Sequence, residues 1–195
     1  MANNSQNTTD LPSYGWLRIL LHWVTGLLVI AAFTLVWAVT KEMMPERNLY
    51  HVWIGLTLMG LVVLRIVVRL FSWKPAPPVE MPRWQSILAH IVQGLIYLIL
   101  LVQPIGGWLA VNAAGYPVNW FGIQLPTLIE KNQAVHDFLF GIPGVDGAEG
   151  TEGMHEILGI ALAVLVGIHI LAALYHRFIR RDQVVQAMLP KFLRR

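Results

Sequence analysis

The sequence predicts an all-α integral membrane protein, a bundle of four transmembrane helices with both termini in the cytoplasm. Three observations predict it: the composition, the lengths of the apolar segments and the distribution of positive charge. Of 195 residues, 56% are hydrophobic and only 13% are charged, which is too apolar for an ordinary soluble domain. The chain has no cysteine, which excludes disulfides, thiolate metal sites and cysteine nucleophiles.

Four apolar segments reach the roughly 20 residues that a membrane helix needs. The predicted spans are 19–40, 51–71, 84–111 and 155–178, within a single domain over 1–195. The longest connection, 112–154, is rich in proline and glycine, and we expect a short helix around 133–139. We expect the basic amphipathic tail, 179–195, to lie on the lipid surface.

Positive charge is concentrated on one side of the predicted spans. Eleven of the fourteen lysines and arginines fall there: Arg18, Arg65, Arg69, Lys74, Arg83, Arg177, Arg180, Arg181, Lys191, Arg194 and Arg195. Lys41, Arg47 and Lys131 fall on the other side, together with eight of the eleven acidic residues. The excess of positive charge predicts the cytoplasmic side, so the longest loop faces outward. Arg65 and Arg69, near the end of the second span, are expected to extend toward the cytoplasmic surface.

Histidines lie at two depths of the predicted bundle. His155 and His169 are fourteen residues apart, about 40° from a whole number of turns, so they share one helix face. A haem with two histidine ligands in a bundle takes one from each of two helices. Depth pairs His51 with His155 on the outer side, and His169 with either His22 or His90 on the inner side.

Histidines inside membrane helices also have two roles other than haem binding. A single intramembrane histidine is usually a hydrogen-bonding residue between helices, but that role does not require pairing at two levels. A zinc or copper site would require its imidazoles at one level. Glycine follows His22, His51, His90 and His155 four residues later, which leaves room for a flat macrocycle or a close helix and does not separate ligands from non-ligands.

Five stretches together resemble the bacterial cytochrome b561 family of short, four-helix, dihaem membrane cytochromes. They are LHWVTGLLVIAAF, HVWIGLTLMGLVVLRIVVRL, LAHIVQGLIYLILLVQPIGGWL, GYPVNWFG and HEILGIALAVLVGIHILAALYHRFIRRD. The resemblance covers about 14–190, in register across all four spans. It implies two haem b groups and a multi-pass protein of the bacterial inner membrane.

The resemblance also implies a ligand set. The family pattern falls on His22 with His169 and on His51 with His155, which makes His90 a neighbour of the inner haem rather than a ligand. In relatives the stretch similar to AVHDFLF runs directly into the fourth helix, whereas here GIPGVDGAEGTEGM intervenes. His136 and His155 therefore compete for one role, and only His155 has the fourteen-residue spacing to His169.

The expected function is electron transfer, because iron with two imidazole ligands has no open position. The family implies ubiquinone or another quinone as one partner. The other is superoxide or a periplasmic redox protein, and no nucleic acid is expected. As an alternative, the chain is the cytochrome b anchor subunit of a larger redox complex. We expect Arg18, His176 and Arg177 to contact inner propionates or a quinone headgroup, and Lys41 and Arg47 to serve the outer haem.

Overall fold

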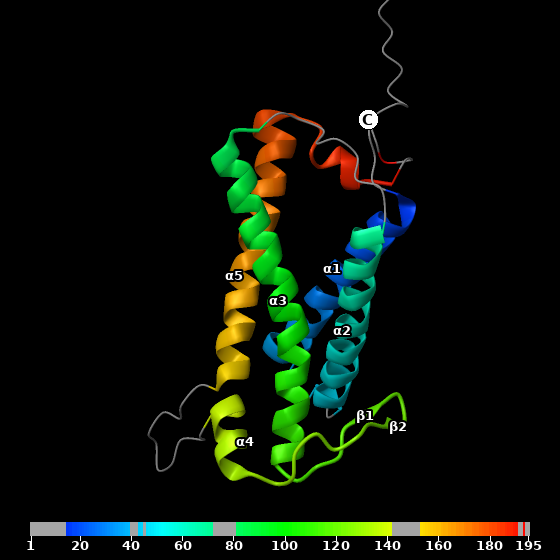
Figure 1. Cartoon of the computed structure of the whole chain (residues 1–195), viewed down its shortest axis with the longest axis vertical. Helices are drawn as coiled ribbons and strands as arrows, with labels where there is room; N and C mark the ends of the chain where they lie inside the picture. The colour runs from blue at the N-terminus through cyan, green and yellow to red at the C-terminus, as the bar shows by residue number, and fades with distance from the viewer. Residues whose placement is uncertain are drawn as a thin grey trace, which may run out of the picture.

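The computed structural model describes residues 15–39, 43–44, 46–71, 81–141, 153–190 and 193. Four long helices run along the molecule: α1 (Trp16–Trp37), α2 (Arg47–Phe71), α3 (Arg83–Ala113) and α5 (Met154–Leu174), the last continued by a π-helical turn, Tyr175–Arg180 (Figure 1). A short helix, α4 (Gln133–Phe140), and a small hairpin of β1 (Asn119–Trp120) and β2 (Ile123–Gln124) lie at one end. We call this end the loop end, and the opposite end, where the segment 175–190 lies, the terminal end.

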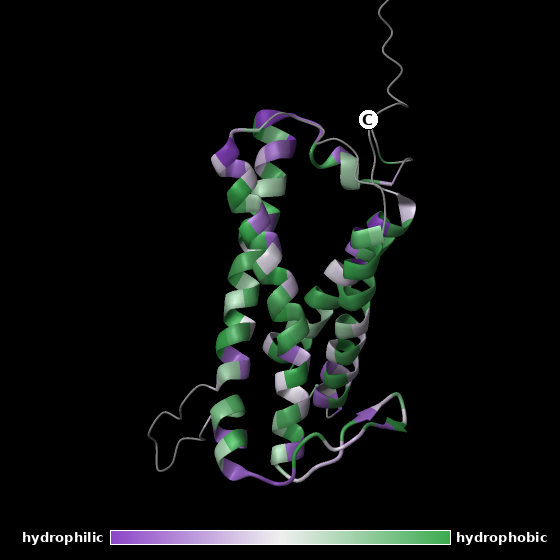
Figure 2. Ribbon diagram, viewed as in Figure 1, coloured by the Kyte–Doolittle hydropathy of each residue, from purple (hydrophilic) through white to green (hydrophobic). Residues whose placement is uncertain are grey.

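All four long helices are apolar enough to cross a membrane. Figure 2 shows apolar residues along most of their lengths, with hydrophilic residues more frequent toward their ends. Many large apolar side chains point outward, among them Leu27, Val63 and Leu171. Outward-facing apolar surface of this extent is unfavourable in water and suits contact with lipid. The predicted class of four long membrane helices is confirmed.

The helices pack in the order α1 on α2, α2 on α3, and α3 on α5. A buried apolar cluster lies near the middle of the bundle: Val29, Leu58, Val62, Ile99, Leu100 and Leu162. Val29 follows His22 by seven residues, and Leu58 follows His51 by seven. Leu162 is seven residues from each histidine of α5. Since seven residues are about two helical turns, the packed centre separates two histidine levels.

The hairpin was not predicted, because its strands have only two residues each and no Asn-Gly or Asp-Gly turn marks it. Its turn, Phe121-Gly122, has positive φ at both positions, as a type I′ turn requires. Two indoles attach it to α2. Trp53 donates to the carbonyl oxygen of Asn119 at 3.0 Å, and Trp120 donates to the Thr57 hydroxyl at 3.2 Å.

The inserted segment leaves and rejoins the fold at one place. A Cβ atom added to Gly153 would collide with backbone atoms of Leu139, Phe140 and Gly141. The end of α4 therefore lies directly against the start of α5, and the two helices follow one another along the same side of the molecule (Figure 1). Residues 142–152 of the insertion lie outside the described ranges.

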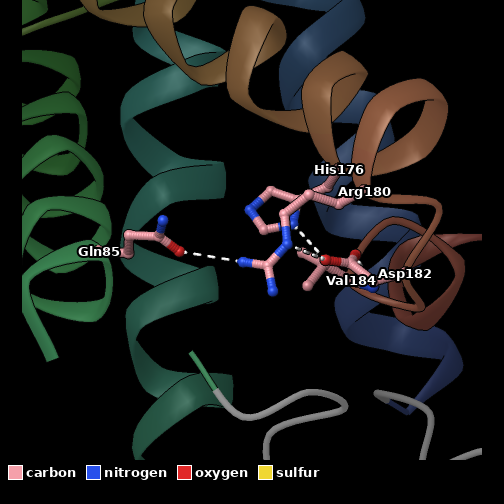
Figure 3. A network of polar contacts seen from close by, with 5 residues as sticks. All are labelled: Gln85, His176, Arg180, Asp182 and Val184. Carbon is pink, nitrogen blue, oxygen red and sulfur yellow. Dashed lines mark hydrogen bonds and ion pairs between the residues drawn. The ribbon is translucent and has the colours of Figure 1, made fainter. Parts of the chain in front are cut away.

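A polar network closes the terminal end. Asp182 accepts from Nδ1 of His176 at 2.6 Å, and Arg180 reaches both Asp182 and, at 3.1 Å, the Gln85 side chain of α3 (Figure 3). Arg181, with a left-handed φ of 53°, ends the helix. The tail then returns to α1, where Trp23 donates to the carbonyl oxygen of Met188 at 2.9 Å. The described part of the tail is thus folded onto the bundle.

Candidate haem sites

The first candidate site is formed by His22 of α1 and His169 of α5. Their ring centroids are 6.1 Å apart, with the ring planes inclined at 67°. Both side chains are half-buried and lie near the terminal end of the bundle. We call this the terminal pair.

The second candidate site is formed by His51 of α2 and His155 of α5. Their ring centroids are 6.2 Å apart at 78°. Nδ1 of His51 is 3.3 Å from the carbonyl oxygen of Ala32, a contact that places a proton on Nδ1 and leaves Nε2 as the basic nitrogen. The Gln103 side chain donates to the backbone carbonyl of His155 at 2.6 Å and holds the first turn of α5. We call this the loop pair.

The separation within each pair fits two imidazoles on one metal ion. A metal–nitrogen bond of about 2 Å on each side places the two ring centres roughly 6 Å apart. Direct contact between two rings also occurs at about 4.5–7 Å, so the separation alone does not decide between the two readings. Three further observations favour a bound group.

The first is helix separation. Within the described ranges, neither α1 with α5 nor α2 with α5 forms an extensive packing contact, although these helices supply the paired rings. The second is open space, because a Cβ added to Gly26 or Gly55 would meet no atom within 4 Å. These glycines lie one turn from His22 and His51 on the same helix faces. There is therefore open space beside one ring of each pair, His22 and His51.

The third observation is an unpaired nitrogen. Nδ1 of His155 is buried and has no hydrogen-bond partner. Buried polar atoms are rarely left in this state, because the cost is about 1–3 kcal/mol. The ring is held against Gly107, whose added Cβ would lie 3.2 Å from Cε1. The described residues contain no cluster of three or more His, Asp or Glu side chains able to hold a metal ion.

Arg65 was expected to extend toward the surface, and the structure corrects this. The side chain turns into the bundle, where its Nη2 is 3.3 Å from Nδ1 of His22. Its guanidinium carbon lies 5.1 Å from the centre of the Tyr97 ring of α3. Sequence reasoning missed Arg65 and Tyr97 as site residues. The available signal was an arginine well inside a membrane span, which is costly unless it has partners.

Two other histidines lie apart from the pairs. His90 is exposed on α3, and its Nδ1 is bonded to the Ser86 carbonyl one turn earlier at 2.6 Å. His136 lies on α4, 3.3 Å from the Asp137 carboxylate, and its ring contacts Phe140. Phe140 in turn contacts the His155 ring. The structure therefore places His155, and not His136, opposite His51.

The remaining predicted site residues lie at the terminal end. Arg18 donates to the carbonyl oxygen of Arg69 at the end of α2, 3.1 Å away. His176 is bonded to Asp182, as described above. Arg177 is half-buried on the same π-helical turn. Lys41 and the side chain of Arg47 lie outside the described residues.

Comparison with known proteins indicates the family of the chain. A family described as prokaryotic cytochrome b561 matches residues 13–191. A probable superoxide oxidase, CybB, of Yersinia pestis is 27% identical over 183 residues, 91% of this chain and 96% of that protein. Cytochrome b561 homolog 2 of Escherichia coli is 30% identical over 193 residues, 94% of this chain and 95% of that protein.

The family match spans nearly the whole chain and all four long helices. Membership of this family implies binding of b-type haem and places the protein as a multi-pass protein in the bacterial inner membrane. The chain belongs to the prokaryotic cytochrome b561 family of membrane electron-transfer proteins.

Proposed function

We propose that the protein is a dihaem cytochrome that transfers single electrons across the inner membrane between a periplasmic donor and ubiquinone. The observation that carries this proposal is the presence of two facing histidine pairs at two levels, both sharing helix α5. One pair lies near each end of the bundle, so a haem at each pair would divide electron transfer across the membrane into shorter steps. A single site would leave most of the membrane thickness to be crossed at once.

The chain's own residues hold and separate the two centres. His22 and His169 would bind one haem, and His51 and His155 the other. Each haem would supply an iron that accepts and releases one electron, and would be held by one imidazole from each helix of its pair. The buried cluster around Val62 and Leu162 excludes water between the two levels. Two histidine ligands on each iron would favour electron transfer over oxygen binding.

The orientation proposed from positive charge places the loop end in the periplasm and both termini in the cytoplasm. Four arginines lie within or beside the π-helical turn and the start of α3 at the terminal end: Arg83, Arg177, Arg180 and Arg181. Lys131 is the described lysine of the loop end, and its side chain covers Gly115. The loop end therefore faces the periplasmic donor.

Superoxide is the donor to test first, because the Yersinia pestis relative is named a probable superoxide oxidase. An anionic donor is attracted by local positive charge. The outer side carries more acidic than basic residues, so a superoxide route requires a local basic surface. Of the three outer cations, only the side chain of Lys131 lies within the described residues.

The test is superoxide-driven reduction of a soluble ubiquinone by the purified protein in detergent. We expect quinol formation that depends on both haems. The control is the variant His51→Ala/His22→Ala, which lacks a ligand from each pair. Quinol formation by the wild type no faster than by this control would exclude superoxide as the donor.

A second function is favoured by the exposed apolar tip of the hairpin. Tyr116, Phe121 and Ile123 are 68%, 60% and 60% exposed at the loop end. A partner subunit docked there would make the chain the cytochrome b anchor of a larger redox complex. Purification of tagged protein in mild detergent distinguishes the two functions. A stoichiometric second polypeptide, lost in Phe121→Ser, supports the anchor function.

A further inference from the structure

We infer that Arg65 raises the reduction potential of the terminal centre above that of the loop centre, so that electrons run from the loop end to the terminal end. This inference rests on the proposed pair of haem centres. It adds a physical cause for electron flow away from the periplasmic donor, which the charge pattern and the family match do not supply. The argument depends on the different groups that touch His22 and His51.

Arg65 is fixed beside the terminal pair by contacts to two other helices. Its Nη2 is 3.3 Å from Nδ1 of His22 on α1, and its guanidinium lies 5.1 Å from the Tyr97 ring centre on α3. An arginine inside a membrane span is costly and marks a functional site by default. The Tyr97 ring attracts the cation and holds it in the bundle.

The guanidinium acts on His22 mainly as a charge. Arginine has five N–H donors and no acceptor, and it stays protonated in proteins. Arg65 can only donate, so Nδ1 of His22 accepts from it in this structure. If Nε2 of His22 bound the iron, Nδ1 would carry the proton, this hydrogen bond would be lost, and the guanidinium would act as a nearby charge alone. The positive charge then remains one imidazole ring away from the metal position. It favours the reduced centre, which carries one positive charge fewer than the oxidised centre.

The groups around the loop pair lower the reduction potential of the loop centre. Nδ1 of His51 is directed at the Ala32 carbonyl oxygen, 3.3 Å away. A ligating histidine that donates to a carbonyl becomes a more basic ligand, which stabilises the oxidised metal. The residue after His155 is Glu156, whose negative charge acts in the same direction. Both differences place the lower potential at the loop end.

The experiment is a redox titration of the full-length protein, following each haem by its optical spectrum. The two potentials are assigned with His51→Ala, which retains only the terminal centre. We expect the wild-type terminal centre to have the higher potential. In Arg65→Gln the reduction potential of the terminal centre should fall by at least about 59 mV, which is a tenfold change in the one-electron equilibrium constant. The potential of the loop centre should stay unchanged.

Two variants control for loss of packing and for general charge. Arg65→Lys keeps a cation on the same helix and should retain the order of the potentials. Arg69→Gln removes an exposed positive charge one turn further along α2 and should shift the terminal potential far less. An equal shift in Arg69→Gln would overturn the inference, because the effect would then come from net charge.

Other outcomes are equally decisive. Equal potentials in the wild type, or a terminal potential unmoved in Arg65→Gln, would refute the direction while leaving two-haem electron transfer intact. Loss of the terminal haem from Arg65→Gln would also refute it, since Arg65 would then retain the haem rather than set its potential. Fewer than two haems in the wild type would remove the proposed function itself, and this inference with it.

Discussion

Single side chains decide which histidines can share a bound group. His22 and His90 occupy similar depths, yet the ring of His22 faces His169, whereas His90 bonds its own helix at Ser86. A histidine that returns to the carbonyl four residues earlier satisfies one ring nitrogen without leaving the helix. We therefore expect His90 to be dispensable for haem binding, although it was placed beside the inner haem on the basis of resemblance.

Alanine substitutions test this assignment. His22→Ala and His169→Ala should each lose one haem, and His51→Ala and His155→Ala the other, because an axial ligand has no substitute nearby. His90→Ala is the matched control and should keep both. Haem quantified against protein by its pyridine adduct gives the ratio. A single haem in His90→Ala would restore His90 to the site.

Gly107 is a second residue whose role follows from distance. A Cβ there would lie 3.2 Å from Cε1 of His155, so Gly107→Ala should push the ring off its rotamer. The cost is about 0.5–1.5 kcal/mol, or roughly a 2- to 10-fold weaker haem affinity at the loop pair. Gly106→Ala is the control, since its Cβ would lie 3.9 Å from Leu139, an ordinary contact. The rate of haem transfer to apomyoglobin measures haem loss from both variants. Equal rates of haem loss from Gly107→Ala and Gly106→Ala would contradict the expectation.

At the scale of elements, the junction of α4 and α5 explains how the chain accommodates its insertion. The backbone of Gly153 lies against that of Gly141, so α4 leads to α5 almost as it would without residues 142–152. Phe140 of α4 contacts the ring of His155, which couples this junction to the loop pair. The insertion therefore does not displace His155. His155, and not His136, faces His51.

Deletion of residues 142–152 tests this element. Because the two flanking glycines are adjacent, we expect the shortened chain to fold and to bind haem like the wild type, with a melting temperature within a few degrees of it. Deletion of residues 129–139, which removes most of α4, is the control of equal length and should lower occupancy of the loop pair. Loss of a haem on removing 142–152 would show that the insertion supports the site.

The π-helical turn is a second element with its own prediction. Asp182 joins His176 and Arg180, and Arg180 ties α5 to Gln85 of α3. Asp182→Asn removes the charge from this half-buried network, and we expect a loss of about 1–3 kcal/mol in unfolding free energy. The haem-loaded protein is followed by thermal denaturation. Glu156→Gln, an exposed acid elsewhere on α5, should have little effect.

For the whole molecule, orientation in the membrane determines which haem meets which partner. The chain has no cysteine, so single introduced thiols report sidedness without interference. We expect Tyr116→Cys, exposed at the loop end, to react with a membrane-impermeant maleimide in intact cells. Ile179→Cys, exposed at the terminal end, should react only after the inner membrane is opened. The reverse pattern would invert the orientation proposed here.

Much of the molecule follows from sequence patterns that depend on local geometry. Hydropathy and length predicted the four helices, because a helix that crosses lipid must be apolar over about 20 residues. Helical periodicity put His155 and His169 on one face, and the motifs pointed to the family that the comparison confirms. The hairpin was missed because it is held by indole hydrogen bonds between β1 and α2 rather than by strand sequence.

The sequence by itself determined the membrane helices, the depth of each histidine and the family. The resemblance implied His22 with His169 and His51 with His155, but only the tertiary structure decided how closely these side chains meet, with ring centroids 6.1 and 6.2 Å apart. It also turned Arg65 inward, onto His22 and Tyr97. The physical reason is that depth and periodicity are set along one helix, whereas a contact depends on the rotation of two helices against each other, which packing determines.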